Sequence, residues 1–293
     1  GLARLLAGDE LQGGVSLLPL ADQGRPLYLM PGASGNPLAY LELAQALEGR
    51  YALIGAQPDM VDRGAALTIE AVAADLAQAI ERRQPQGPVL LAGHSFGSAI
   101  AFETARLLAR QGRTVGALVL IDTPVPNGGD EFAGFGEIDW IVSIADAAGS
   151  YFGQPIDLAP EELEPLPSDA RRALMLARFQ AAGALPAGAS RQVIDDLLAT
   201  YQNSIAAFSA YRPAYWDGAL SVIRSEQEHG IDDPTLGWGG LCREIGITAA
   251  APGDHISMVA SAHAAELAKR IVLCVDSALE AGQARDKEAA ATV

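Results

Sequence analysis

The chain has 293 residues, of which 49% are hydrophobic and 19% charged, and its 20 basic and 36 acidic residues give a formal net charge of −16. This composition supports one large α/β domain or two small ones and argues against global disorder. The acidic balance argues against nonspecific binding to nucleic acids or anionic membranes, and no apolar run reaches the roughly 18 residues that a bilayer span requires.

The two cysteines and the chain ends give weaker signals. Cys242 and Cys274 form no CxxC motif, and we expect reduced thiols in a cytoplasmic protein, with a disulfide as the weaker alternative. The chain begins with Gly1 rather than Met, which suggests a segment of a longer polypeptide or a chain that has been processed. We expect residues 1–24 to be a linker or an entry segment, and 281–293 a flexible tail.

Short apolar runs alternate with amphipathic stretches from residue 25 onward. Strands are predicted at 27–30, 51–56, 89–92 and 117–121, and helices at 37–47, 68–83 and 98–110. Buried strands separated by helices are typical of a parallel sheet that is covered on both faces. The sequence therefore predicts an α/β fold.

The alternation stops after Asp122. Residues 126–213 contain helical patterns only, at 137–148, 160–182 and 190–211. A helical insertion of this length in an α/β sheet is typical of a lid, although any single apolar position in it is more simply core packing. Strands at 220–224 and 245–249 and a closing helix at 257–279 then complete the predicted domain.

The segment VLLAGHSFGS places Ser95 between a predicted strand and a predicted helix, with Gly93 and Gly97 two residues away on either side. This pattern is typical of a nucleophile elbow, a sharp turn that exposes a serine hydroxyl at the start of a helix. The structural alternative is a glycine-rich turn with a buried serine. The pattern predicts a nucleophile at Ser95.

A serine hydroxyl needs a base, and the chain has four histidines. We expect the base to be His255, in the loop APGDHISM between the last strand and the last helix, because this loop should lie at the carboxyl edge of the sheet near Ser95. His94 should point away from the serine, His229 lies in a polar loop, and His263 falls in the last helix. The alternative for His255 is a residue that only caps the closing helix.

The acid that orients the base is predicted to be Asp122, which ends the strand that follows the serine's helix. Four rivals follow the later strand, a position that many α/β hydrolases use: Glu226, Glu228, Asp232 and Asp233. These rivals lie in a hydrophilic loop, whereas Asp122 follows a buried strand. This difference favours Asp122.

An oxyanion needs two N–H donors. The first is predicted to be the N–H of Phe96, the residue after the serine. The second should come from the loop MPGASGNP, where Ala33 is the candidate. An ordinary tight turn is the alternative for this loop.

With Ser95, Asp122, the helical insertion and His255 in this order, the chain resembles the thioesterase domains that end modular nonribosomal peptide and polyketide synthases. These domains are a branch of the α/β hydrolases. The resemblance covers roughly residues 25–280 and rests on LYLMPGASG, GPVLLAGHSFGSAIAFETARLLARQG, ALVLIDTPVP, YWDGALSVIRSE and APGDHISMV. It implies an α/β-hydrolase fold, a mostly parallel central sheet flanked by helices with a helical lid insertion, and it supports Asp122 as the acid. Ser98 stands where many relatives have glycine, Met30 stands where histidine or proline is frequent, and the lid is poorly matched.

The resemblance also implies a function. An acyl chain would pass from the phosphopantetheine arm of an acyl or peptidyl carrier protein onto Ser95 and leave by hydrolysis or macrocyclisation, with no bound cofactor and no metal. The alternatives are a stand-alone editing thioesterase, a free carboxylesterase or lipase that acts strongly on oxygen esters, and a hydrolase-like fold that only binds.

Overall fold

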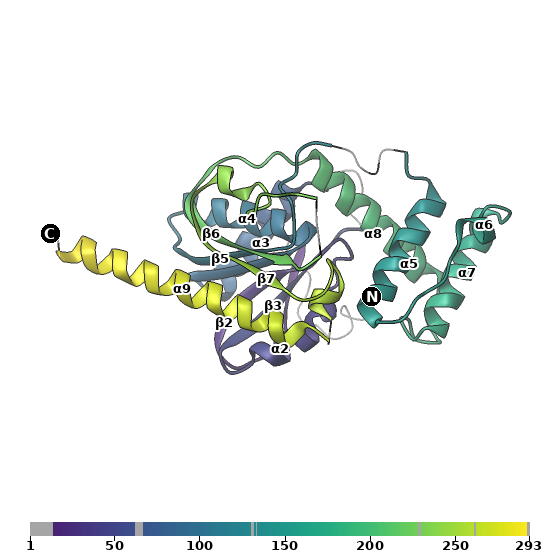
Figure 1. Ribbon diagram of the computed structural model, residues 1–293, viewed down its shortest axis with the longest axis horizontal. Helices are drawn as coiled ribbons and strands as arrows, with labels where there is room; N and C mark the ends of the chain where they lie inside the picture. Colours follow the sequence, from purple (N-terminus) through teal and green to yellow (C-terminus); the bar gives the residue numbers. More distant parts are fainter. Residues whose placement is uncertain are drawn as a thin grey trace.

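The protein is described by a computed structural model that covers residues 14–61, 67–129, 132, 134–227, 230–260 and 262–291. Within this part of the chain, seven strands form one sheet in the order β1-β3-β2-β4-β5-β6-β7 (Figure 1). The strands are β1 (Val15–Pro19), β2 (Arg25–Met30), β3 (Tyr51–Pro58), β4 (Val89–His94), β5 (Val115–Ile121), β6 (Trp216–Ser225) and β7 (Cys242–Ala251). Only β1 runs antiparallel to its neighbour, and the other pairs are parallel. The predicted α/β-hydrolase architecture is confirmed.

Strand β1 differs from the sequence expectation, because it lies within residues 1–24, which were expected to be a linker. It pairs with β3 from Val15 opposite Pro58 to Pro19 opposite Ile54. Its side chains are mostly half-buried, as expected at the edge of a sheet, so its hydrophobic pattern is short and weak. Each of the other strands contains a predicted one.

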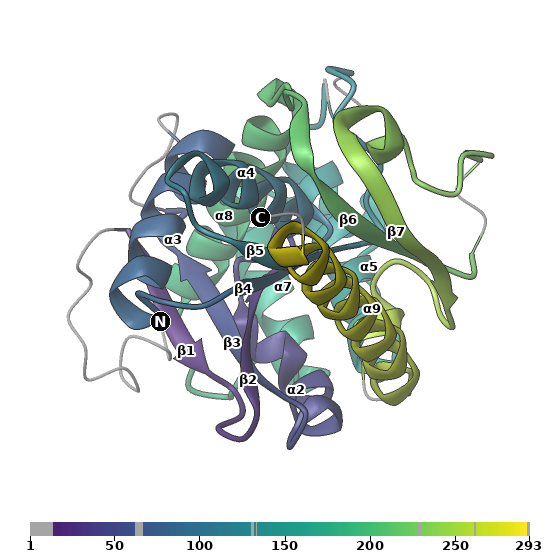
Figure 2. The ribbon, with the colours of Figure 1, turned by 90° about the vertical axis from the view of Figure 1, so that its left-hand side faces the viewer.

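Helices cover both faces of the sheet (Figure 2). The covering helices and short 3₁₀ turns are η1 (Pro37–Tyr40), α2 (Leu41–Leu47), α3 (Ile69–Arg83), α4 (Phe96–Arg110), η3 (Trp238–Leu241), η4 (Ser257–Val259) and α9 (Ala264–Ala291). Buried side chains of α3 and α4 pack on one face, and those of α2 and α9 on the other. Two apolar layers thus bury the strands on both sides, which explains their continuous hydrophobic runs.

The lid helices lie at one end of the molecule (Figure 1), and the end of α8 packs against the core of the sheet domain through Ala207 and Phe208. They are α5 (Glu137–Phe152), α6 (Pro160–Leu163), α7 (Ser168–Ala181) and α8 (Arg191–Ala210). The helix predicted at 160–182 is divided in two, because Pro165 and Pro167 follow α6 and proline interrupts helical hydrogen bonding. These helices have their own apolar cluster, which includes Trp140, Met175 and Phe179.

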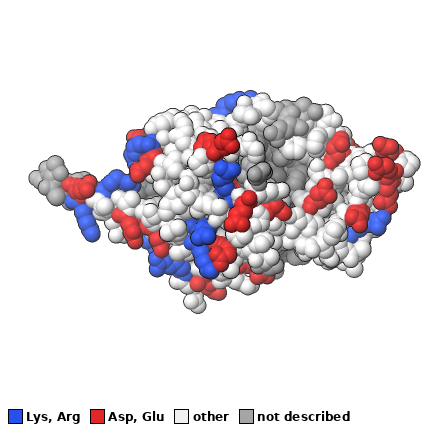
Figure 3. Space-filling view, viewed as in Figure 1, with Lys and Arg blue, Asp and Glu red and all other residues white. Residues whose placement is uncertain are grey.

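Exposed acidic side chains gather at the outer end of the lid, over α6 and the start of α7 (Figure 3). They are Glu161, Glu162, Glu164 and Asp169.

The closing helix also differs from its prediction. Residues 257–259 form η4, so α9 begins at Ala264 and His263 precedes it. The helix then continues to Ala291, through most of the predicted flexible tail, and extends away from the sheet (Figure 1). No helix in the described ranges is long and apolar enough to cross a membrane. Cys242 and Cys274 are buried free thiols.

Candidate active site

The turn between β4 and α4 has the geometry of a nucleophile elbow. Ser95 has a φ of 54° and a ψ of −132°, a strained conformation for a residue with a side chain. A Cβ atom at Gly93 would lie 2.3 Å from the Gly97 carbonyl oxygen, and one at Gly97 would lie 2.2 Å from the Met30 carbonyl oxygen. Both glycines are therefore needed for the close approach of strand, turn and helix.

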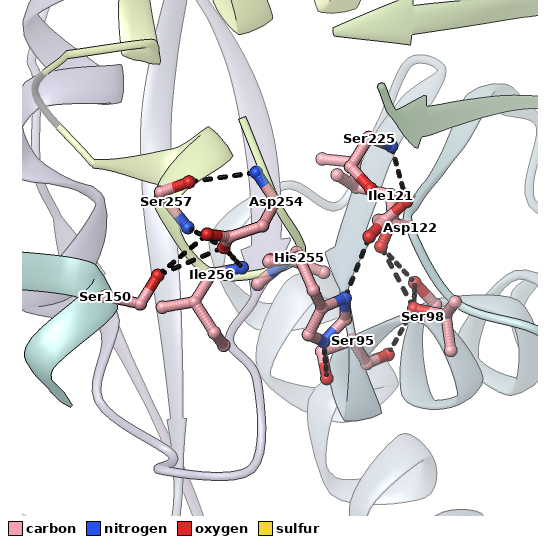
Figure 4. A network of polar contacts seen from close by, with 12 residues as sticks. Ser95, Ser98, Ile121, Asp122, Ser150, Ser225, Asp254, His255, Ile256 and Ser257 are labelled. Carbon is pink, nitrogen blue, oxygen red and sulfur yellow. Dashed lines mark hydrogen bonds and ion pairs between the residues drawn. The ribbon is translucent and has the colours of Figure 1, made fainter. Parts of the chain in front are cut away.

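Ser95, His255 and Asp122 form a continuous hydrogen-bonded relay (Figure 4). The His255 Nε2 atom lies 2.9 Å from Ser95 Oγ, and its Nδ1 atom lies 2.9 Å from Asp122 Oδ2. Because an ionised carboxylate only accepts hydrogen bonds, Nδ1 carries the proton and Nε2 is left to accept from the serine hydroxyl. The structure therefore brings together the three residues that the sequence selected.

Strand register explains why Ser95 and Asp122 meet. His94 at the end of β4 pairs with Ile121 at the end of β5, so the next residue of each strand lies at the same edge. Asp122 also has a positive φ of 53°. Its side chain is fully buried, and its Oδ1 accepts a hydrogen bond from the backbone N–H of Ser225 on β6. A buried carboxylate fixed in this way can orient an imidazole.

Asp254 shapes the loop that carries His255. Its Oδ1 accepts hydrogen bonds from the N–H groups of Ile256 and Ser257, both at 2.8 Å, which is the local turn chemistry expected of an aspartate. Ser150 on the lid helix α5 adds a hydroxyl 3.1 Å from each Asp254 oxygen. The lid is thus bonded directly to the loop of the candidate base.

The other candidates that the structure describes have other partners or are exposed, and His94 bonds to Tyr40 and to the His255 carbonyl. His263 donates its backbone N–H to Ala260 ahead of α9. Asp233 caps its own turn through Thr235 and Gly237. The side chains of Glu226 and Asp232 are exposed, whereas Glu228 and His229 lie outside the described residues.

The two predicted oxyanion donors belong to segments that flank Ser95. Phe96 begins α4, and the first N–H groups of a helix have no partner within it. A Cβ atom at Gly32, which precedes Ala33, would lie 3.4 Å from Ser95 Cβ, so this loop runs against the serine. The Ala33 carbonyl accepts a hydrogen bond from Ser204 on the lid helix α8.

Three residues of the site were not foreseen: Tyr40, which bonds to Gly32 and His94, and the lid serines Ser150 and Ser204. Tyr40 and Ser204 lie within predicted helices and Ser150 follows one, and each bonds to a residue distant in the sequence: His94, Ala33 and Asp254, respectively. The helical pattern around each residue does not reveal these contacts.

An open groove of about 690 Å³ lies where the lid meets the His255 loop. Its lining includes Val142, Ser150, Ile156, Leu158, Asp254 and Ser257. Within the described ranges, no group of three or more histidine, cysteine or acidic residues is placed to hold a metal ion.

A family model described as the thioesterase domain matches residues 25–134. The resemblance to thioesterase domains is confirmed. The matched segment contains Ser95 and Asp122, and it ends just before the lid helix α5.

Two curated relatives share this likeness. Non-reducing polyketide synthase men2 of Menisporopsis theobromae is 41% identical over 101 residues, which cover 33% of this chain and 5% of that protein. Chondramide synthase cmdD of Chondromyces crocatus is 29% identical over 253 residues, which cover 83% of this chain and 6% of that protein. The chain therefore spans only a small part of the length of these relatives.

Among solved structures, a four-domain nonribosomal peptide synthetase with bound AMP and glycine is similar to this chain with a TM-score of 0.76. The two are 24% identical, and the alignment covers 92% of this chain and 21% of that one. This similarity concerns the fold, and it includes most of this chain.

Proposed function

We propose that the chain is the chain-releasing thioesterase domain of a polyketide or nonribosomal peptide synthase. The observation that carries this proposal is the relay from Ser95 through His255 to the buried Asp122. The thioesterase-domain match around Ser95 supports a thioester as the substrate. The substrate would be an acyl chain on the phosphopantetheine arm of an acyl or peptidyl carrier domain.

In the acylation half-reaction, Ser95 Oγ attacks the thioester carbonyl carbon while His255 Nε2 takes the hydroxyl proton. Asp122 stabilises the resulting imidazolium, and the N–H groups of Phe96 and Ala33 donate to the oxyanion. The intermediate collapses with cleavage of the carbon–sulfur bond, and His255 returns its proton to the departing thiolate. The products are the acyl ester of Ser95 and the free pantetheine thiol.

In the release half-reaction, His255 acts as base again. It takes a proton from water, or from a hydroxyl or amine at the far end of the acyl chain, as this group attacks the ester carbonyl. The second tetrahedral intermediate expels Ser95 Oγ, which recovers its proton from His255. Water gives a free acid, and an internal nucleophile gives a ring.

The test is turnover on matched substrates. Peptide-like and polyketide-like acyl chains are offered as pantetheine thioesters, as carrier-bound thioesters and as simple oxygen esters, with Ser95→Ala as control. We expect thioesters with long chains to have the highest kcat/KM and the alanine variant to be inactive. A preference for oxygen esters would instead indicate a general esterase, and a preference for acetyl thioesters would indicate an editing enzyme.

A further inference from the structure

A second hydrogen-bonded chain runs behind the candidate relay. The hydroxyl of Tyr40, at the end of η1, lies 3.0 Å from the backbone N of Gly32 and 2.9 Å from His94 Nδ1. The other ring nitrogen of His94, Nε2, lies 2.8 Å from the backbone carbonyl oxygen of His255. Tyr40 and His94 are each only 3% exposed. These hydrogen bonds therefore connect the loop of the predicted oxyanion donor to the backbone of the predicted base.

The direction of every bond in this chain can be assigned. A carbonyl oxygen only accepts, so His94 Nε2 carries a proton. Burial lowers the pKa of His94 to about 3, and the nearby His255 adds to this effect, so the ring is neutral near pH 7 and Nδ1 has no proton. The Tyr40 hydroxyl must then donate to Nδ1 and accept from the Gly32 N–H. Each group has one role, and no alternative pattern satisfies them all.

This assignment matters to both ends of the chain. Because the Gly32 N–H is committed to Tyr40, it is not available to an oxyanion, and the next N–H along the loop belongs to Ala33. At the other end, the rings of His94 and His255 lie 5.0 Å apart between centroids. A neutral His94 avoids the repulsion that a second positive ring would exert when His255 becomes an imidazolium.

We infer that Tyr40 and His94 are positioning residues that hold the oxyanion loop and the His255 backbone in a fixed relation. The inference rests on the proposed function, because it assigns these residues to the same acyl-transfer site. Loss of the Tyr40 hydroxyl would free the Gly32 peptide and leave His94 Nδ1 without its donor. A displacement of an oxyanion donor or base by about 1 Å is enough to reduce the rate by on the order of 10²-fold.

A second buried tyrosine of the protein, Tyr28, provides a matched control. The hydroxyl of Tyr28 on β2 is also buried, but it has no hydrogen-bond partner among the described residues. Tyr28→Phe and Tyr40→Phe therefore remove the same atom from two buried tyrosines, and only the second change removes hydrogen bonds to Gly32 and His94. His94→Asn and His94→Gln test the two hydrogen bonds of His94 separately. Asparagine can replace only the Nδ1 acceptor, and glutamine only the Nε2 donor.

The experiment measures two rates for each variant: labelling of Ser95 by a fluorophosphonate and thioester turnover, with melting temperature as a folding check. We expect Tyr40→Phe to lower the labelling rate and kcat by roughly 10- to 100-fold with KM unchanged. Both His94 variants should show smaller losses of the same kind, and Tyr28→Phe should match the wild type.

Rates for Tyr40→Phe within twofold of those for Tyr28→Phe would overturn the inference, as would a loss that appears only in KM. Failure of the proposed function has a different signature: Ser95 is labelled in the wild type, but no thioester is turned over. In that case, the labelling rates of Tyr40→Phe and Tyr28→Phe would still test the positioning role. Absence of any labelling in the wild type would overturn both.

Discussion

The carboxyl edge of the sheet and the lid are held by different kinds of interaction. At the edge, Ser95 and Asp122 both have positive φ angles, and a buried carboxylate is fixed from two sides. The lid has a small apolar cluster of its own and a set of partly exposed ion pairs, such as those between Glu137 and Arg172 and between Arg178 and Glu162. Substitutions at the edge should therefore affect chemistry, whereas those in the lid should affect substrate choice and stability.

The family match follows the same division, because it includes both strained residues and stops at residue 134, before α5 begins at Glu137. Hydrogen bonds connect the regions, among them those from Ser150 to Asp254 and from Ser204 to Ala33. The predictions below test how sharply chemistry and lid are separated, from the largest expected effect to the smallest.

The largest effect is expected from Asp122→Asn. An amide cannot hold His255 in the tautomer that accepts from Ser95, so kcat should fall by about 10⁴-fold, the loss seen for the corresponding change in a serine protease. Asp232→Asn is the control. Because the Asp232 side chain is exposed, this change should leave kcat unaltered. Steady-state kinetics on an acyl thioester measures both. A larger loss in the control would place the acid after β6.

Gly97→Ala tests the close packing at the elbow. The new Cβ would lie 2.2 Å from the Met30 carbonyl oxygen, so the turn must shift and both melting temperature and kcat should fall, with kcat lower by on the order of 10²-fold. Gly282→Ala is the control, because a Cβ there would meet nothing within 4 Å. Equal melting temperatures and rates for the two variants would show that the elbow tolerates displacement.

The edge could be predicted from the sequence because its signals are local. Glycines flank Ser95 at fixed spacing, Asp122 directly follows a buried run, and His255 lies in the loop before the closing helix. Adjacent parallel strands then bring these positions to one edge. The position of its loop at this edge also distinguished His255 from the other three histidines.

The features that were missed depend on partners distant in the chain. Strand β1 is defined by its pairing with β3 rather than by its own pattern. The bond from Tyr40 to His94 spans 54 residues, and the bond from Ser150 to Asp254 spans 104. A sequence shows which residues can donate or accept, but only the folded chain determines which of them meet.

Ser150→Ala tests the connection between the lid and the histidine loop. Loss of one hydrogen bond to a carboxylate should lower kcat by roughly tenfold or less, because the Asp254 turn retains its backbone partners. Ser168→Ala is a matched control, since Ser168 also donates to a carboxylate, that of Glu137, within the lid. Kinetics on one thioester compares them. An equal loss in both would mean that the lid acts on catalysis through its general stability.

The smallest effect concerns the stability of the lid as a function of pH. Partial burial alone would raise the pKa of Glu137, but hydrogen bonds from Ser168, Arg172 and Arg171 outweigh it and hold the pKa below its usual range. This stabilisation is present above the pKa of an unfolded glutamate and is lost as pH falls through the lowered folded value.

Glu137→Gln should therefore lower the melting temperature by about 2–4 °C at pH 7, and the difference should shrink under acidic conditions. Thermal unfolding at several pH values measures it, with the exposed Glu161 changed to Gln as control. A difference that grows as pH falls would contradict the assigned direction of the shift.

The central claim is that Ser95 carries the acyl chain. Mass spectrometry of the intact protein after mixing with a panel of acyl thioesters, followed by peptide mapping, tests this claim directly. We predict that the wild type gains the mass of the acyl group on the peptide containing Ser95, that Asp122→Asn gains it far more slowly, and that Ser95→Ala gains none. Acylation of the Ser95→Ala variant at the wild-type rate, or of the wild type at another residue, would contradict the account.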